Sequence, residues 1–370
     1  MPVEFIGQVA TRFGSEIHPP SGPAIDPEFL HRFVTAHEEA GFDKVLVGHS
    51  SSGPDGLQVA AFAAGHTHSL GYLVAHRPGF MAPTLAARAF ATLDRFSGGR
   101  VAMHTISGGS DADQARDGDH VDKAARYRRT DEYLEVVTRT WTDDEPFDHR
   151  GEFYEVVDVD AAARPLQQPR IPVYFGGSSA DAYRVGGKHA DVFALWGEPL
   201  AETAEQIGAV HEAARAAGRT TMPGISVSFR PILGATEDEA WARAHDVLDR
   251  IVANGGGGGS FTGRSAHRGG HETTRTNVGS QRLMAAAERG ELHDRCLWTP
   301  TAAASGAAGN STALVGTPET VAAALLDYVD LGVTTFLLRG YDPLDDTAAY
   351  GRDLLPLVRD EVARREHVPA

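Results

Sequence analysis

The stretch YFGGSSADAYRVGGKHADVFALWGE, residues 174–198, joins two short apolar runs through a segment with helical spacing. The first run, 171–175, ends in two glycines and two serines, and the second run covers 192–195. A strand that passes into a helix and then into another strand is typical of α/β folds with parallel sheets. The turn Gly176–Ser179 fits an anion site, because backbone N–H groups, the positive end of the helix dipole and two hydroxyls converge there. It also fits an ordinary helix N-cap after a tight turn.

The same alternation continues along the whole chain. Apolar, β-rich runs occur at 3–9, 44–47, 71–74, 101–106, 171–175, 192–195, 225–232 and 334–338. Segments with helical spacing separate most of them, at 27–41, 56–65, 82–97, 124–141, 179–188, 201–217, 237–253 and 318–331, with a last one near 346–364. Strands and helices in this order predict an α/β fold of the (β/α)8 TIM barrel type, although a doubly wound sheet would show a similar alternation.

Three longer segments interrupt the pattern, at about 107–122, 142–168 and 254–300. The second contains FDHRGEFYEV, which resembles a β-hairpin. We expect a single domain over residues 1–370 with these three insertions. Insertions at the C-terminal ends of barrel strands tend to carry function.

The third insertion begins with five glycines at 255–259. No Gly-Lys-Ser/Thr follows them, and they leave a helix instead of a strand, so they do not form a P-loop; a flexible hinge is the simpler interpretation. A basic patch follows, made of Arg264, His267, Arg268, His271 and Arg275. It is either a solvated loop or a lid that closes on a negatively charged substrate.

Charge and composition exclude several classes of partner. A formal net charge of −16 argues against binding to nucleic acid or to an anionic membrane. No apolar run approaches the ~20 residues of a membrane span, and the start of the chain carries no secretion signal, so a cytoplasmic location is expected. Cys296 is the only cysteine, which excludes an intramolecular disulfide and a multi-cysteine metal site. We expect no metal site, and the chain has no dinucleotide fingerprint of the Gly-x-Gly-x-x-Gly type.

Polar side chains gather at or just beyond the predicted strand ends. They are His49, His76, Arg77, His104, Ser107, Trp196, Arg230, Arg339 and Tyr341. In a barrel these positions meet at one mouth. Together with the turn Gly176–Ser179 they indicate a pocket for an anion.

Several motifs occur in an order that resembles one enzyme family. They include HRPGFMAPTLAARAFATLDRFSGGR (76–100), RYRRTDEYLEVVTRTW (126–141), PLQQPRIPVYFGGSSADA (165–182), ALWGEP (194–199), NSTALVGTPETVA (310–322) and LGVTTFLLRGYDPL (331–344). Over roughly 40–365 the chain resembles the bacterial-luciferase-like flavin monooxygenases, and most of all their alkanesulfonate monooxygenase branch. The resemblance implies a barrel with FMN across its mouth, reduced FMN delivered by a separate NAD(P)H:FMN reductase, and O2 activated at the flavin. A homodimer or homotetramer is expected.

The resemblance also assigns cofactor residues. It places the FMN phosphate against Gly177, Ser178 and Ser179, with Tyr127 and the region of the adjacent Arg126 completing the cradle. The positions that face the flavin correspond to Ala75 and His76 after the third strand, and to His104 and Ser107 in and after the fourth. His104 departs from the family pattern, in which asparagine is usual, and it could still donate a hydrogen bond to the flavin.

The positions at which the family binds its substrate match this sequence less completely. Trp196 and Tyr341 match, whereas Pro54 stands where relatives carry cysteine, and Ser228 and Arg230 stand for an arginine and a histidine. The same reaction class on a different substrate is therefore expected.

We predict that an anionic organosulfonate is desulfonated to sulfite and an aldehyde. His76, His104 and Arg230 would orient the anion, Tyr341 would transfer a proton, and Trp196 and Arg339 would complete the catalytic set. The lid would contribute Arg264, His267, Arg268 and His271. Alternatives are a flavin-dependent monooxygenase of another small sulfur or nitrogen compound, a deazaflavin-dependent oxidoreductase, and a flavin-binding barrel without activity.

Overall fold

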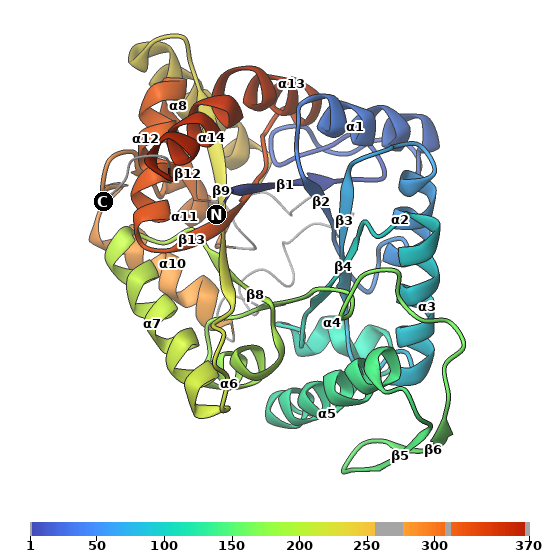
Figure 1. Ribbon diagram of the computed structural model, residues 1–370. Helices are drawn as coiled ribbons and strands as arrows, with labels where there is room; N and C mark the ends of the chain where they lie inside the picture. The colour runs from blue at the N-terminus through green and yellow to red at the C-terminus, as the bar shows by residue number, and fades with distance from the viewer. Residues whose placement is uncertain (1, 256–276, 308–311, 367–370) are drawn as a thin grey trace.

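The computed structural model describes residues 2–255, 277–307 and 312–366. Parallel strands form a closed barrel in which each strand pairs with the next, and the last pairs with the first (Figure 1). The barrel strands are β1 (Glu4–Val9), β2 (Lys44–Val47), β3 (Gly71–His76), β4 (Val101–Thr105), β7 (Val173–Gly176), β8 (Val192–Trp196), β9 (Gly224–Leu233) and β13 (Val333–Leu338). The predicted (β/α)8 barrel is confirmed.

Helices surround the barrel (Figure 1). They are α1 (Pro27–Glu39), α2 (Gly56–Ala64), α3 (Pro83–Phe96), α5 (Lys123–Thr142), α6 (Ala180–His189), α7 (Leu200–Ala216), α8 (Glu237–Ala253), α12 (Pro318–Asp330), α13 (Pro343–Ala349) and α14 (Leu355–Glu366). Asp26, Ser179 and Thr236 each accept a backbone N–H at the start of α1, α6 and α8, which satisfies donors that the helix itself leaves unpaired. Each of the segments predicted to be helical from its spacing contains at least one of these helices.

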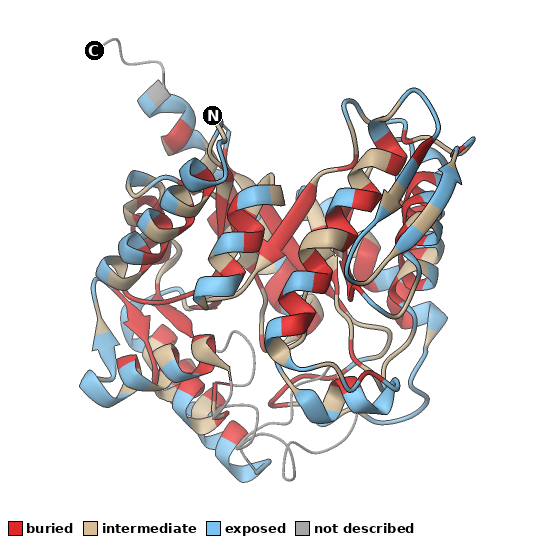
Figure 2. Ribbon diagram, turned by 90° about the horizontal axis from the view of Figure 1, so that it is seen from below, coloured by how far each residue is buried: buried red, intermediate tan, exposed pale blue. Residues whose placement is uncertain are grey.

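The barrel strands bury both faces, as Figure 2 shows by their red colour between the helices. Alternate side chains along each strand point to opposite sides. Ile6, Leu73, Ala102 and Tyr174 pack together inside the barrel, whereas the neighbouring residues on the same strands pack against the helices. This alternation decides which polar residues reach the mouth.

Strand β9 belongs to two sheets. It pairs with β13 up to Phe229, and from Arg230 onward it pairs with β12 (Ala313–Gly316). The short strands β11 (Leu297–Trp298) and β10 (Leu292–His293) extend β12 in antiparallel fashion. We call β10, β11 and β12 the side sheet.

All three insertions contain regular elements. Residues 142–168 hold the expected hairpin, formed by β5 (Phe147–Arg150) and β6 (Glu155–Val159). From Asn277 onward, the segment predicted to be a lid forms α10 (Val278–Arg289), the strands β10 and β11, and the start of α11 (Pro300–Ala304). The segment 107–122 contains the short helix α4 (Asp111–Arg116).

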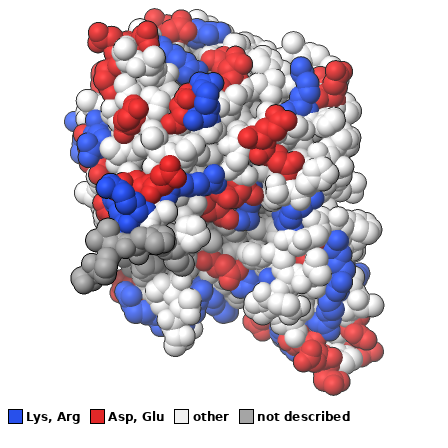
Figure 3. Space-filling model, turned by 45° about the horizontal axis from the view of Figure 1, so that its top comes forward, with Lys and Arg blue, Asp and Glu red and all other residues white. Residues whose placement is uncertain are grey.

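The surface mixes charges of both signs. On the face drawn in Figure 3, Lys and Arg side chains lie among Asp and Glu side chains. Within the described ranges, no helix is long and apolar enough to cross a membrane.

Candidate functional site at the barrel mouth

The turn after β7 forms a tight cradle. Gly177 has a φ of 148°, and a Cβ added to it would lie 2.7 Å from the Cβ of Ala182. The hydroxyl of Ser179 accepts the N–H of Ala182 at 3.2 Å and donates to the hydroxyl of Tyr127 at 3.2 Å. Burial raises the pKa of Tyr127, so its hydroxyl keeps its proton. Close backbone, hydroxyls and a helix N-terminus together fit a phosphate.

Five predicted residues share the inward face of the barrel. By the alternation along their strands, Ala75, His104, Trp196, Arg230 and Arg339 point to the same side as the residues that fill the barrel. They stand at the carboxyl ends of β3, β4, β8, β9 and β13, or directly after them. The structure therefore brings these five together at the mouth.

His104 has a free polar atom in this layer. Its Nδ1 is buried and has no hydrogen-bond partner among the residues that the structure describes. A Cβ added to Gly176 would lie 3.4 Å from its ring, so Gly176 borders the ring on that side. Burial lowers the pKa of His104 to about 4, so the ring is neutral at neutral pH. A neutral ring with an unused nitrogen fits a hydrogen bond to a flavin.

Arg230 and Arg339 share one carboxylate, that of Glu16 in the loop between β1 and α1. Arg230 donates to both oxygens of Glu16, at 3.1 and 2.9 Å, and to the carbonyls of Arg339 and Gly340, at 2.7 and 2.9 Å. Arg339 also donates to Glu16. Burial alone would raise the pKa of Glu16, but the two guanidinium groups hold it below its usual value. We call Glu16, Arg230 and Arg339 the mouth triad.

The mouth triad corrects the role predicted for Arg230 and changes the setting of Tyr341. The Arg230 side chain is only 1% exposed, and its guanidinium is taken up by Glu16 and two carbonyls, so it orients Glu16 and does not lie open to an anion. The Cζ atom of the Arg230 guanidinium lies 3.8 Å from the centre of the Tyr341 ring. Tyr341 is buried in one cluster with Ile232 and Trp298. Tyr341 therefore packs behind Arg230.

Comparison with known proteins identifies the family. The family profile described as luciferase-like monooxygenase matches residues 3–335. The chain belongs to this family.

Several solved structures share the fold of this luciferase-like protein and match it over nearly its whole length. A riboflavin lyase, solved with modified FMN and riboflavin, has a TM-score of 0.79 at 20% identity, over 98% of this chain and 92% of its own. EDTA monooxygenase from Chelativorans sp. BNC1 has a TM-score of 0.77 at 18% identity, over 98% and 94%. An F420-dependent secondary alcohol dehydrogenase, solved with an F420-acetone adduct, has a TM-score of 0.68 at 15% identity, over 97% and 100%. At these identities the likeness establishes the fold.

In this luciferase-like protein the position predicted for His76 is wrong. His76 follows Ala75 by one residue, so its side chain points out of the barrel toward the helices. Its Nε2 lies 2.6 Å from the hydroxyl of Tyr133 on α5, and its ring packs edge-on against Phe90 of α3. His76 therefore joins two outer helices to β3 and does not face the mouth.

We expect the buried histidines to make stability depend on pH. Burial lowers the pKa of His37, His76 and His104 to about 4, from 6.5. Between these two values the unfolded chain binds protons that the folded chain does not, so stability falls as the pH drops from 6.5 toward 4. His76→Phe should reduce the slope of unfolding free energy against pH by up to about 1.4 kcal/mol per unit in that window.

Urea unfolding at a series of pH values measures this slope. In alkaline buffer the His76 ring is neutral in both the folded and the unfolded chain. The difference in unfolding free energy between the wild type and His76→Phe there isolates the lost contact of His76 with Tyr133. Equal slopes for His76→Phe and the wild type would contradict the prediction.

Three more predicted residues, Ser107, Ser178 and Arg126, lie in the described part of the chain. The hydroxyl of Ser107 is 3.2 Å from that of Thr130, and Ser178 lies in the turn after β7. Arg126 donates to the carbonyl of Val121 and to Asp111, both at 2.6 Å, so it holds the segment that carries α4. The predicted lid residues Arg264, His267, Arg268 and His271 lie outside the described residues. In the described part of the chain, no three His, Cys, Asp or Glu side chains gather as a metal site would require.

Sequence reasoning missed Glu16. This residue stands in a polar segment, FGSEIHPP, that has neither helical nor strand periodicity. A buried carboxylate is costly unless it is paired. The excess of arginine at the predicted strand ends was the only signal that a counter-charge was needed.

Proposed function

We propose that this protein is a two-component monooxygenase that uses reduced FMN and O2 to desulfonate a small organosulfonate, releasing sulfite and an aldehyde. The observation that carries the cofactor assignment is the cradle of Gly177, Ser179 and Tyr127 at the start of α6. The reductase is proposed because the sequence carries no dinucleotide fingerprint.

Different residues would bind the phosphate and the ring of FMN. The turn Gly177–Ser179 and Tyr127 would hold the FMN phosphate, and Ala75 and His104 would line the ring. Reduced FMN, when bound, supplies the two electrons with which O2 is activated. One oxygen atom then enters the aldehyde as the carbon–sulfur bond breaks, and the other leaves as water. The site would have to exclude bulk water, because solvent would divert the oxygen chemistry.

The charge of the mouth supports an anionic substrate. The mouth triad contains two guanidinium groups and one carboxylate. Burial lowers the pKa of Arg339, yet a guanidinium stays protonated in proteins, so the triad retains one positive charge. Arg339 is 17% exposed, which makes it the member of the triad that can meet a sulfonate.

We expect the purified chain alone not to oxidise NADH or NADPH. Addition of an FMN reductase, NADH and a panel of alkanesulfonates should start oxygen uptake with release of one sulfite per O2 consumed by the coupled reaction. Oxygen uptake is measured with an electrode and sulfite with a thiol-exchange dye, and omission of the sulfonate is the control. Reduction of a substrate by reduced F420 without oxygen would replace this proposal by the deazaflavin alternative, and steady NADH oxidation by the chain alone would exclude a separate reductase.

A further inference from the structure

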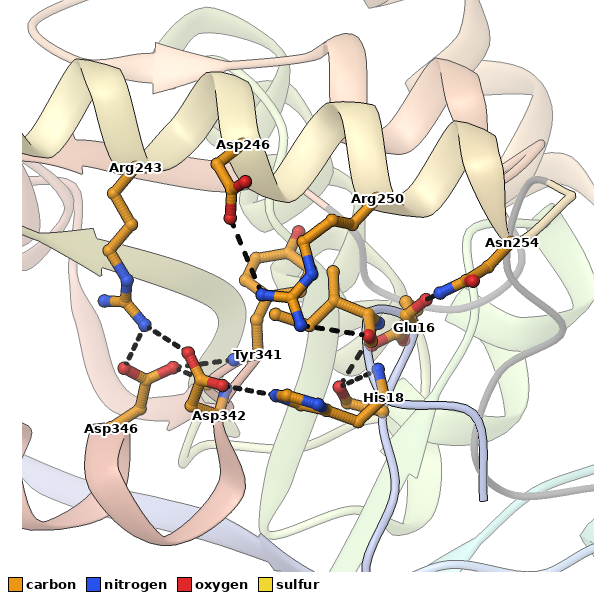
Figure 4. A network of polar contacts seen from close by, with 12 residues as sticks. Glu16, His18, Arg243, Asp246, Arg250, Asn254, Tyr341, Asp342 and Asp346 are labelled. Atoms are coloured by element: carbon orange, nitrogen blue, oxygen red, sulfur yellow. Dashed lines mark hydrogen bonds and ion pairs between the residues drawn. The ribbon is translucent and has the colours of Figure 1, made fainter. Parts of the chain in front are cut away.

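The loop that carries Glu16 is fixed to α8. The side-chain amide of Asn254 donates to the carbonyl of Glu16 at 3.0 Å, and Arg250 donates to the carbonyl of Ile17 at 3.4 Å (Figure 4). Both contacts use the backbone of the loop, so they hold Glu16 in place and leave its carboxylate to the arginines.

The same loop is fixed on its other side to α13. The Nε2 of His18 lies 2.5 Å from a carboxylate oxygen of Asp342. Arg243 of α8 donates to Asp342 at 3.0 Å and to Asp346 at 2.6 Å, which joins α8 to α13 (Figure 4). Because the loop is held between these helices, Glu16 acts as a fixed negative charge beside the mouth.

The triad is asymmetric toward the mouth. Arg230 is enclosed, with donors directed to Glu16 and to two carbonyls. Across the described residues, the guanidinium of Arg339 has Glu16 as its one carboxylate partner, and it is the more exposed of the two arginines. An anion that reaches Arg339 therefore meets a cluster with one positive charge in excess.

We propose that Glu16 is a specificity-determining residue that limits the substrate headgroup to a single negative charge. A monoanion brings the cluster to neutrality, whereas a dianion leaves a second charge unpaired in a site that is largely out of water. A sulfonate fits this condition, and a doubly ionised phosphonate of the same tetrahedral shape does not. The inference rests on the proposed function for the place of the substrate, but its test needs no turnover.

The test compares methanesulfonate with methylphosphonate in alkaline buffer, where the phosphonate carries two charges. Binding is measured by titration calorimetry with oxidised FMN at saturating concentration and with no reductant, so that the phosphate cradle at Gly177–Ser179 is occupied and no turnover takes place. The wild type should bind methanesulfonate more tightly. Glu16→Gln should bind methylphosphonate about tenfold more tightly than the wild type does, because one nearby negative charge has been removed, and the preference should reverse.

Two further variants keep the test decisive. Glu16→Asp retains the charge and should retain the preference for methanesulfonate. Glu16→Gln combined with Arg230→Gln again leaves one positive charge, on Arg339, so it should bind methanesulfonate more tightly than methylphosphonate. If Glu16→Gln alone does not fold, a preference for methylphosphonate in this double variant would overturn the inference. Unchanged preference in a folded Glu16→Gln, or no binding of methanesulfonate to the wild type, would overturn the inference. Reversal of preference without sulfite release in the coupled assay would leave the charge rule standing and remove only the desulfonation reaction.

Discussion

Replacement of Gly177 by valine is expected to weaken FMN binding at least about a hundredfold, which corresponds to about 2.7 kcal/mol. The φ of 148° at Gly177 is a conformation that side chains with a Cβ rarely adopt. The new Cβ would also lie 2.7 Å from the Cβ of Ala182 and 3.5 Å from the hydroxyl of Tyr127. The turn would have to move, so its N–H groups and the Ser179 hydroxyl would no longer point toward the phosphate together.

Quenching of FMN fluorescence on titration with protein measures this affinity. Gly208→Val is the matched control, because Gly208 lies on the exposed side of α7 and a Cβ there would meet nothing within 4 Å. The control should bind FMN as the wild type does. If Gly177→Val does so too, the phosphate is not held by this turn.

Glu16→Ala is expected to lower the free energy of unfolding by about 3–5 kcal/mol, the usual cost of leaving a buried charge without its partner. Arg230 is 1% exposed and would lose the carboxylate that receives two of its hydrogen bonds. The pKa of Glu16 is lowered in the folded chain, so its contribution is present at neutral pH. That contribution is lost progressively as the pH falls from the ordinary pKa of a glutamate, 4.5, to this lowered value.

Urea unfolding at neutral pH measures the effect. Glu152→Ala removes a carboxylate whose ion pair with Arg128 is exposed to solvent. This control should have nearly the same free energy of unfolding as the wild type. Adding Arg230→Met to Glu16→Ala removes the unpaired buried charge and should recover part of the loss. A change no larger than that of the control would show that water or movement of Arg230 compensates for the missing carboxylate.

Most of the barrel could be predicted because local signals mark the ends of its elements. For α3, Pro83 suits the first turn, and Gly98 and Gly99, with φ of 71° and 84°, follow the end of the helix. The helix predicted at 82–97 is observed at Pro83–Phe96. Strand β12 (Ala313–Gly316) was missed because four apolar residues do not distinguish a strand from a loop or a helix end.

The site was harder to predict because it depends on orientation and on distant contacts. The third strand was expected at 71–74 but extends to His76, and without its true end the alternation could not separate Ala75 from His76. Glu16 and Arg230 are 214 residues apart in the chain. Only the closed barrel brings them together, so no local pattern could reveal the pair.

The double membership of β9 has an evolutionary consequence. Its first part is bound to the barrel through β8 and β13, and its last part is bound to the side sheet through β12. Gain or loss of one residue within Gly224–Leu233 would turn Arg230 away from Glu16 or break the register with one of the two sheets. Homologous sequences should therefore keep the length of this strand constant, while the β5–β6 hairpin, which pairs only with itself, is free to vary in length.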